Sequence, residues 1–443
     1  MKLLIIQPTY YYSPEDRRLH KTKSRALVPL TLPYLAALTP KEWEVKLIDE
    51  QIEDIDFNEK ADVVAITTWT INSFRAYDIA DRFRKRNIPV IMGGPHIYFH
   101  SDEALKHCDA VCIGEAEYVW KEMLEDCAAG RLKKIYKADR FHDLKDLPFP
   151  RYDLLKDKIN RYGIIKTYSV QTSRGCPFKC EFCSERFYLG TTYRYRPVEE
   201  VIEEIRYLKK LGARYIFFAD SNFAGKLSHT MELIEALIPL KIRWSTLWSL
   251  YLCKNKELMD LAKRSGLLHV NMGMESIDER TLKGMNKKAN RVSEYKEILE
   301  NLRKREISYS LNFIFGWDTE TPDIFKATLQ FLLENKVPAA YFNILTPHKG
   351  TPLYERMKRE GRIININDIG RWPGIRCYIK PAYCSPSQLE RYVRWMYVKF
   401  YSVSSIMKRL SFSFTKANIA SWIINISQRR IAFSEKAENF DAF

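Results

Sequence analysis

The chain has 443 residues, of which 46% are apolar and 13% aromatic, a composition that predicts packed cores and excludes a largely disordered protein. It carries 71 Lys and Arg against 55 Asp and Glu, and the resulting net charge of +16 favours anionic partners: nucleic acid, a phospholipid surface or a phosphate-bearing cofactor. No apolar run reaches the roughly 18 residues of a membrane-spanning helix. The length predicts two or three domains.

The first eight residues have too short an apolar core for a signal peptide and predict a buried strand instead. Nine cysteines in a chain of this length, without an export signal, do not form a disulfide framework. We therefore expect a cytoplasmic protein whose thiols stay reduced and can hold a metal.

Residues 1–137 alternate short apolar runs with amphipathic stretches such as Phe74–Arg86, which predicts an α/β domain with parallel strands. The expected strands are Lys2–Ile6, Glu44–Ile48, Val63–Thr67, Pro89–Met92 and Ala110–Ile113. This spacing fits a doubly wound, Rossmann-like sheet, which binds ligands at the carboxyl ends of its strands. Residues 138–165, with Pro148 and Pro150, are expected to be a linker.

Residues 166–350 continue the alternation with six further strand candidates. These are Tyr168–Thr172, Tyr215–Ala219, Ile242–Thr246, Leu268–Met272, Ser310–Phe315 and Ala340–Leu345. Six βα units predict a partial (β/α)6 barrel, two units short of the closed eight-fold form. By analogy with closed barrels, the chemistry is expected at the carboxyl ends of the strands.

Residues 351–443 differ in character and are expected to form a helical C-terminal extension, with no acidic residue between Glu390 and Glu435. Trp395, Tyr397, Phe400 and Tyr401 recur at near-helical spacing, which predicts packing against the open side of the barrel. The alternative is a basic, apolar platform at a membrane surface. No nucleic-acid-binding motif accompanies the charge, so we do not expect a nucleic acid partner.

Three cysteines follow the first strand of the second block in the spacing C-x3-C-x2-C: Cys176, Cys180 and Cys183. Thiolates select zinc, copper(I) or iron–sulfur clusters. A zinc site needs a fourth ligand, and the nearest histidines, His142 and His229, are too distant in sequence to supply it locally. Three thiolates on a cubane cluster leave one iron open to a substrate or cosubstrate. The spacing therefore favours a catalytic cluster over zinc or plain buried thiols.

This motif, with the aromatic Phe182 before its last cysteine, resembles that of the radical S-adenosylmethionine (radical SAM) superfamily. The resemblance implies that Cys176, Cys180 and Cys183 are the catalytic metal ligands of a [4Fe-4S] cluster. It also implies that the open iron binds S-adenosylmethionine, which is cleaved to a 5′-deoxyadenosyl radical, and that Phe182 packs near the adenine.

Later segments extend the resemblance to the cosubstrate site. Gly273 and Glu275 match the G-x-E-S motif of that superfamily, whose Glu contacts the cosubstrate. The other matching positions, all expected near the ends of barrel strands, are Asp220, Ser221, Asn222, Asn312, Gly316 and Leu345. Two departures lie at Ser221, where a second Asp is common, and at His348-Lys349, where Pro-Gly is common. The alternative for Gly273 and Gly316 is that they are turn residues closing their strands.

The N-terminal block resembles the cobalamin-binding branch of the superfamily through Met92-Gly93-Gly94-Pro95-His96 and Ile113-Gly114-Glu115-Ala116-Glu117. The resemblance implies that cobalamin contacts Gly93 and Gly94, whereas a tight turn is the alternative. The D-x-H-x-x-G ligand signature of other cobalamin domains is absent. We expect none of the loop histidines to ligate cobalt: His20, His96, His100 and His107. Cys108, Cys112 and Cys127 lack cluster spacing and are expected to be buried small hydrophobes.

The function predicted from the residues and the resemblance is a cobalamin-dependent radical SAM enzyme that methylates an unactivated carbon. The tail resembles the extension of a subgroup that includes hopanoid methylases, which implies a small-molecule or lipid-like substrate. A reductant such as flavodoxin or ferredoxin and a peripheral contact with the inner membrane face are also expected. One alternative is a radical SAM cyclase, coupling or rearrangement enzyme without methyl transfer; a remote one is a non-enzymatic zinc or RNA-binding protein.

Overall fold

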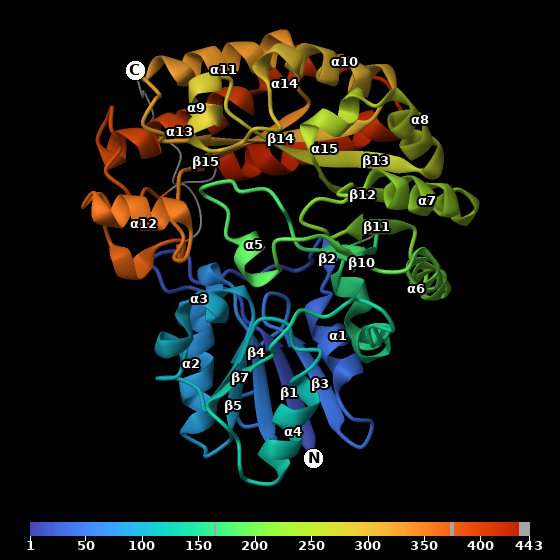
Figure 1. Ribbon diagram of the computed structural model, residues 1–443, viewed down its shortest axis with the longest axis vertical. Helices are drawn as coiled ribbons and strands as arrows, with labels where there is room; N and C mark the ends of the chain where they lie inside the picture. Colours follow the sequence, from blue (N-terminus) through green and yellow to red (C-terminus); the bar gives the residue numbers. More distant parts are fainter. Residues whose placement is uncertain (164, 373–375, 434–443) are drawn as a thin grey trace. The chain divides into compact units, whose positions relative to one another are not determined.

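The computed structural model describes residues 1–163, 165–372 and 376–433 (Figure 1). The chain forms two compact units. The first comprises Met1–Gly175, Glu185–Tyr215 and a short segment that begins at Gly370, and the second comprises Cys176–Ser184, Ile216–Ile369 and the described C-terminal tail. The predicted domain boundaries stay predictions.

The first unit contains a parallel sheet with the strand order β3-β1-β4-β5-β6-β7. Its strands are β1 (Lys2–Gln7), β3 (Glu44–Asp49), β4 (Val63–Thr67), β5 (Val90–Gly93), β6 (Ala110–Ile113) and β7 (Ile135–Lys137). The order reverses between β1 and β4, which makes the sheet doubly wound and confirms the expected fold class. Five of these strands were predicted, whereas the short edge strand β7 was not.

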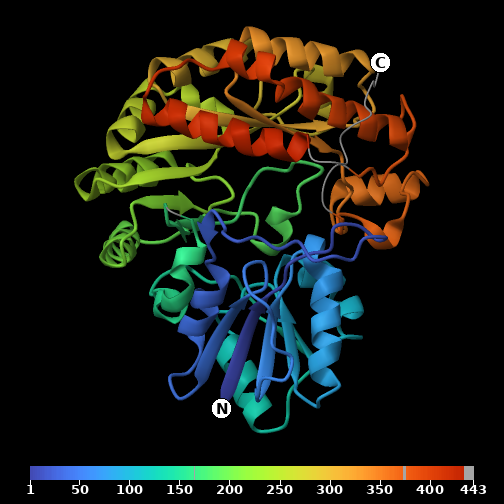
Figure 2. The same cartoon turned by 180° about the vertical axis from the view of Figure 1, so that it is seen from behind.

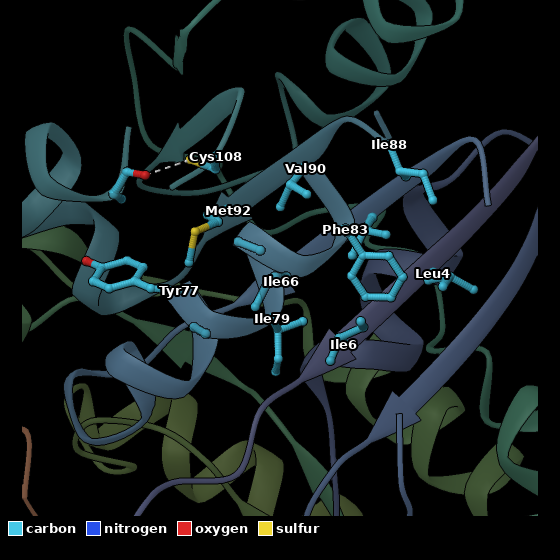
Figure 3. Packing of buried hydrophobic residues seen from close by; sticks show 14 of the residues in the cluster. Leu4, Ile6, Ile66, Tyr77, Ile79, Phe83, Ile88, Val90, Met92 and Cys108 are labelled. Carbon is cyan, nitrogen blue, oxygen red and sulfur yellow. Dashed lines mark hydrogen bonds between the residues drawn. The ribbon is translucent and has the colours of Figure 1, made fainter. Parts of the chain in front are cut away.

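Helices cover both faces of this sheet: α2 (Ser73–Arg84) and α3 (Pro95–Ala104) lie on one, and α1 (Thr31–Leu38) and α4 (Trp120–Ala128) on the other (Figure 1). Buried side chains of α2, including Tyr77, Ile79 and Phe83, pack against the strand residues Ile6 and Ile66 (Figure 3). Because both sheet faces are buried, the strands consist of almost continuous apolar runs.

The rest of the first unit is built from short elements and one longer helix, α6. These are β2 (Leu27–Val28), η1 (Thr70–Asn72), η2 (Tyr152–Arg161), β8 (Thr167–Val170), β9 (Ser173–Arg174), α5 (Glu185–Tyr188), β10 (Arg194–Tyr195) and α6 (Val198–Lys210). The segment predicted as a linker contains η2, whose Tyr152 and Leu155 are buried. Lys158 donates from this helix to the carbonyl of Leu47 over 2.7 Å. This part of the segment therefore packs within the first unit.

The remaining barrel strands lie side by side in chain order: β11 (Tyr215–Phe218), β12 (Arg243–Trp248), β13 (Leu267–Glu275), β14 (Ser308–Phe315) and β15 (Ala339–Ile344). The segments between them form α7 (Leu227–Leu237), η3 (Ile238–Leu240), η4 (Leu250–Lys254), α8 (Lys256–Ser265), α9 (Glu279–Gly284), η5 (Val292–Glu294), α10 (Tyr295–Lys304) and α11 (Asp323–Glu334). With β8, these strands match the six predicted barrel strands, each within a few residues.

The tail is helical, as predicted: α12 (Pro352–Arg359), η6 (Ile366–Asp368), α13 (Pro386–Phe400), α14 (Val403–Arg409) and α15 (Lys416–Ala432). Helix α13 packs on the edge strand β15, where the Tyr401 hydroxyl accepts from the Ala340 N–H and donates to its carbonyl. The expected packing on the open side of the barrel is therefore confirmed for Phe400 and Tyr401, which are fully buried, whereas Trp395 is only half-buried. Among the described residues, no helix combines the length and the apolar character needed to cross a bilayer.

Candidate functional site: a cysteine loop beside a lysine–glutamate ion pair

The three cysteines lie on the loop 176–184 of the second unit and are free thiols, with Cys180 buried and the other two half-buried. Within the loop, the Cys183 N–H donates to the Cys180 carbonyl over 3.3 Å. The loop is also fixed from outside, because Asn286 donates to the Lys179 carbonyl over 2.7 Å. These hydrogen bonds fix the backbone conformation of the loop that carries the three thiols.

Lys287 places a positive charge next to this loop. Its ammonium group pairs with the Glu275 carboxylate at 2.9 Å and lies 6.0 Å from the centre of the Phe182 ring. Burial lowers the pKa of Lys287, but the negative charge of Glu275 and the thiols Cys180 and Cys183 raises it more, so the group stays cationic. Burial raises the pKa of Cys180, and Lys287 opposes that rise. Lys287 therefore favours thiolates in this loop.

The predicted G-x-E-S motif forms a β-bulge at the end of β13. The register with β14 shifts between Gly273 and Glu275, and Glu275 adopts a φ of 66°. A Cβ on Gly273 would lie 2.1 Å from the Glu275 carboxylate, so a glycine is required for that carboxylate to fold back over the strand. Asn290 donates to the carbonyls of Gly273 and Met274 and holds the bulge. Gly273 is thus more than a strand-closing turn: the bulge aims Glu275 at Lys287.

The other predicted cosubstrate residues also lie at or near the carboxyl ends of strands. Asp220 and Asn222 are buried directly after β11, and the Ser249 hydroxyl donates to the Asn222 side-chain oxygen over 3.0 Å. Asn312 is the register partner of Gly273 and donates to the Asn271 side chain. The remaining residues are the half-buried Ser221 after β11, Gly316 after β14 and the buried Leu345 after β15. Gly273, Glu275 and Asn312 are thus neighbours on adjacent strands.

A buried carboxyl group, Glu320, holds the turn after β14 and was not predicted. It accepts hydrogen bonds from the backbone N–H groups of Gly316 and Trp317 at 2.7 and 3.0 Å and from the Tyr383 hydroxyl at 3.2 Å. Burial raises the pKa of Glu320 to about 8, although these bonds oppose the rise. Gly316 itself has a φ of 111°, so the turn alternative for this glycine has structural support.

In the first unit, Gly93 and Gly94 lie at the carboxyl end of β5, beside the end of β4. Gly94 has a φ of 105°, and a Cβ there would lie 2.7 Å from the Thr68 carbonyl oxygen, so this glycine is needed for the turn. A Cβ on Gly93 would meet only Cys112, at 3.5 Å, and one on Gly114 would meet no atom within 4 Å. The buried Thr68 hydroxyl has no hydrogen-bond partner among the described residues. This strand edge therefore fits the approach of a large cofactor.

Glu115 and Glu117, which follow Gly114, form a buried ion network with Arg174. Arg174 pairs with Glu115 at 3.1 Å and with Glu117 at 2.6 Å. The Tyr34 hydroxyl donates to Glu117 over 2.8 Å. Burial raises the pKa of Glu117, but the charge and hydrogen bonds of Arg174, with the bond from Tyr34, hold it below its ordinary value. The network ties the loop after β6 to strand β9 within the first unit.

The histidines of the first unit all have protein partners. Tyr77 bonds to the buried His96, and Asp81 pairs with His107 at 2.9 Å. His20 contacts Gln51, and His100 contacts Glu103 at 3.5 Å. The ligand atoms of His96, His100 and Glu103 lie within 4.8 Å of one another, but Arg371 also pairs with that carboxylate at 2.5 Å, which disfavours a cation there. Cys108 and Cys112 are buried as predicted, whereas the prediction was wrong for Cys127, which is half-buried.

Sequence reasoning missed Lys287, Asn290 and Glu320. Each is a single polar residue in a connecting segment, where neither periodicity nor spacing marks it. A buried charge can be recognised only after folding shows what surrounds it. Three thiols lie on a loop near the Lys287 cation, which is paired with one carboxylate. This set of groups fits an anionic iron–sulfur cluster.

Comparisons with known proteins agree with this arrangement. The family model described as Radical SAM superfamily matches residues 170–332, and the model described as B12 binding domain matches residues 25–124. Bacteriochlorophyllide d C-12(1)-methyltransferase of Chlorobaculum tepidum is 32% identical over 390 residues, which cover 86% of this chain and 84% of that protein. Hopanoid C-2 methylase of Rhodopseudomonas palustris is 26% identical over 350 residues, covering 76% and 65%.

The fold also matches a solved structure. The radical S-adenosylmethionine methyltransferase TsrM from Kitasatospora setae, determined with cobalamin and a [4Fe-4S] cluster bound, has a TM-score of 0.67 at 16% identity. The match covers 99% of this chain and 90% of that one. At 16% sequence identity, this comparison shows a shared fold alone.

Proposed function

Because the chain belongs to the radical SAM superfamily and carries a B12 binding domain, we propose that it is a cobalamin-dependent methyltransferase acting on an unactivated carbon. The observation that carries the proposal is the cysteine loop beside the Lys287–Glu275 pair, in a chain that also contains a doubly wound B12-type sheet. Two of the relatives are named as methylating a bacteriochlorophyllide and a hopanoid. We infer a small-molecule or lipid-like substrate for this chain.

Cys176, Cys180 and Cys183 would ligate the [4Fe-4S] cluster. When bound, the cluster and cobalamin supply the one-electron reduction of S-adenosylmethionine and the carrier for the methyl group. Lys287 offsets the negative charge of the thiolates and fixes the position of the Glu275 carboxylate. Glu275 would then accept a hydrogen bond from the cosubstrate, while Phe182 offers an apolar surface for the adenine.

The remaining strand-end residues would line the cosubstrate site. Asp220, Ser221 and Asn222 offer polar groups after β11, and Asn312 offers an amide next to Gly273. The backbone around Gly316 and Leu345 would complete the wall, since the Leu345 N–H donates to the Phe315 carbonyl and joins the two strand ends over 2.8 Å. A preorganised wall of this kind excludes water from a reactive intermediate.

Cobalamin would lie at the carboxyl edge of the first sheet, against Gly93 and beside Gly94 and Gly114. The histidines of this unit are engaged by protein partners, so we propose that none of them ligates cobalt. The net charge of +16 would attract an acidic electron carrier such as flavodoxin or ferredoxin. The free thiols of the chain suit a reducing cytoplasmic environment. We propose in addition a peripheral contact with the inner membrane face.

The proposal is tested by replacing one cysteine. The enzyme is purified without oxygen and supplied with S-adenosylmethionine, dithionite and cobalamin. We expect about four irons per chain and production of 5′-deoxyadenosine in the wild type, and loss of both in Cys180→Ala. The matched control is Cys127→Ala, because Cys127 is a half-buried thiol outside the loop and its removal should leave both readouts unchanged. Undiminished 5′-deoxyadenosine formation in Cys180→Ala would contradict the cluster assignment.

The same assay separates methyl transfer from the alternative of a radical cyclase or rearrangement enzyme. Transfer of a methyl group from S-adenosylmethionine leaves S-adenosylhomocysteine, which the alternative does not produce. We expect both 5′-deoxyadenosine and S-adenosylhomocysteine in the presence of substrate. Production of 5′-deoxyadenosine alone would favour the alternative, and zinc in place of iron would exclude both.

A further inference from the structure

Helix α15 in the tail buries small and polar residues and exposes apolar ones. The residues that face its own unit are small or polar: Ala417, Ser421, Asn425 and Ala432 are all buried. They follow one another at helical spacing and therefore share one face. The helix crosses the strands β13 to β15 on the side seen in Figure 2, where it is drawn in red. An ordinary surface helix would present its apolar stripe to these strands.

Polar contacts fix this orientation. Asn425 donates to the Pro338 carbonyl over 2.7 Å, and the hydroxyls of Ser421 and Ser308 lie 2.9 Å apart. The buried Arg409 of α14 donates to the Asn425 side-chain oxygen over 3.0 Å. Rotating α15 to bury its apolar face would break all of these bonds in a buried setting, where unpaired polar groups are costly. The helix is therefore held with its apolar side outward.

The outward face is a row of isoleucines: Ile419, Ile423 and Ile426 are 44, 58 and 50% exposed. Their spacing of four and three residues places them on the side opposite Ser421 and Asn425. Lys416 precedes the row and Arg430 follows it on the same side, and both are exposed. The row is thus an apolar stripe with a cation at each end.

Exposed aromatic residues also lie in the loop that leads into α15. Phe412, in the loop before α15, is 68% exposed and contacts the Trp422 ring of α15 with 5.6 Å between centroids. Phe414, in the same loop, is 92% exposed. Of the 21 exposed large apolar residues in the described part of the chain, nine lie within 403–433, so exposure is concentrated in the tail. Such a concentration marks a binding surface.

We propose that this surface, the outward face of α15 with Phe412 and Phe414, docks the protein on an anionic phospholipid bilayer. An interfacial helix buries its apolar face at the boundary of headgroups and acyl chains, and flanking Lys and Arg pair with anionic headgroups. No acidic residue lies between Glu390 and Glu435 to repel such a surface. In a two-fold contact between copies, Lys416 would face Arg430 without an acidic partner, so a membrane fits better than a second copy. The inference does not depend on the methyl-transfer proposal.

The test uses the full-length protein and vesicle flotation. We expect it to float with vesicles of equal parts phosphatidylglycerol and phosphatidylcholine, to stay behind with phosphatidylcholine alone, and to release from the anionic vesicles as salt rises. Ile423→Glu should lower vesicle binding at least tenfold. Ile366→Glu is the matched control, because Ile366 is 50% exposed but lies in η6, outside the proposed surface, and this variant should bind like the wild type.

Two further measurements keep the outcomes distinct. Circular dichroism and the thermal midpoint should be the same in both variants and the wild type, since both positions are on the surface. Failure of the wild type to bind anionic vesicles, or equal binding by Ile423→Glu, would overturn the proposal. If Ile423→Glu instead turns a dimer into a monomer in light scattering, while no form binds vesicles, the surface is an interface between copies and the membrane proposal is wrong.

Discussion

Glu320 shows how one buried residue can shape the turn after β14 without belonging to a motif. Its carboxyl group accepts bonds from two consecutive backbone N–H groups, those of Gly316 and Trp317, and from the Tyr383 hydroxyl. Its other oxygen is buried without a partner among the described residues. Since burial raises the pKa to about 8, the group is largely protonated at neutral pH.

This raised pKa makes stability depend on pH. Between the ordinary carboxyl pKa of 4.5 and the folded value of about 8, the folded state binds a proton that the unfolded state has lost. Stability should therefore fall as pH rises through this window, by on the order of 5 kcal/mol in total. Glu320→Gln should remove this fall and make the variant more stable than the wild type at pH 9. Urea unfolding at a series of pH values measures both the pH dependence of stability and the difference in stability at pH 9.

Exposed Glu355 supplies the control for that experiment, because Glu355→Gln changes the same functional group outside a buried turn. That variant should keep the pH dependence of the wild type. A slope equal to the wild type's in Glu320→Gln would mean that Glu320 ionises normally and that some other group sets the dependence.

At the scale of elements, the tail helix α13 closes the free edge of the second unit's sheet. Strand β15 has β14 on one side, and on the other the Tyr401 hydroxyl pairs with both backbone groups of Ala340. Tyr397 adds a second contact, accepting from the Phe342 N–H over 3.1 Å. Side-chain hydroxyls here replace the hydrogen bonds that a further strand would make, which protects an edge otherwise open to pairing.

Tyr401→Phe should therefore destabilise the protein by about 1–3 kcal/mol, because it leaves a buried N–H and a buried carbonyl without partners while the ring still fills its place. Tyr397→Phe is the matched control: it removes one acceptor from a half-buried position and should cost less. Urea unfolding of the two variants measures the difference. If both variants unfold like the wild type, water satisfies the strand edge and α13 does not close it.

The same scale shows what periodicity can and cannot predict. The apolar spacing identified the barrel strands and placed Phe400 and Tyr401 in the core, because burial repeats with the period of the element. It did not predict β7, because this strand has only three residues and its apolar Ile135 is exposed while Tyr136 is buried. For α15, spacing shows that Ile419, Ile423 and Ile426 share a face, but not that this face points outward. That orientation depends on bonds to Pro338 and Ser308, which are far away in sequence.

For the whole molecule, motif spacing predicted which chemistry to expect but not the surroundings that support it. The cysteine spacing predicted a metal cluster because thiolates at that spacing mark the ligand type, whereas cobalamin was implied only by the family resemblance of the glycine motifs. The bulge that aims Glu275 at Lys287 could not be predicted, since it depends on Asn290 reaching back to two carbonyls. The adjacent Gly93 and Gly94 could not be told apart in the sequence. In the structure, a Cβ would fit at Gly93 but would collide with the Thr68 backbone at Gly94.

That difference allows a test of cobalamin binding to the intact protein. Gly93→Ala adds a methyl group that meets Cys112 at an ordinary 3.5 Å, so the variant should fold normally but bind cobalamin at least fivefold more weakly, because the methyl occupies the strand edge that the cofactor approaches. Gly94→Ala would instead place its Cβ 2.7 Å from the Thr68 carbonyl oxygen and should destabilise the protein whether or not cobalamin is present. Equilibrium dialysis with hydroxocobalamin and thermal melts measure the two effects separately.

The wild type should bind cobalamin without a histidine ligand, visible in its absorption spectrum, and gain about 2.7 kcal/mol of stability at a hundred times the Kd. A histidine-ligated spectrum would contradict the proposal that no histidine ligates cobalt, and wild-type affinity in Gly93→Ala would show that the cofactor does not lie against Gly93.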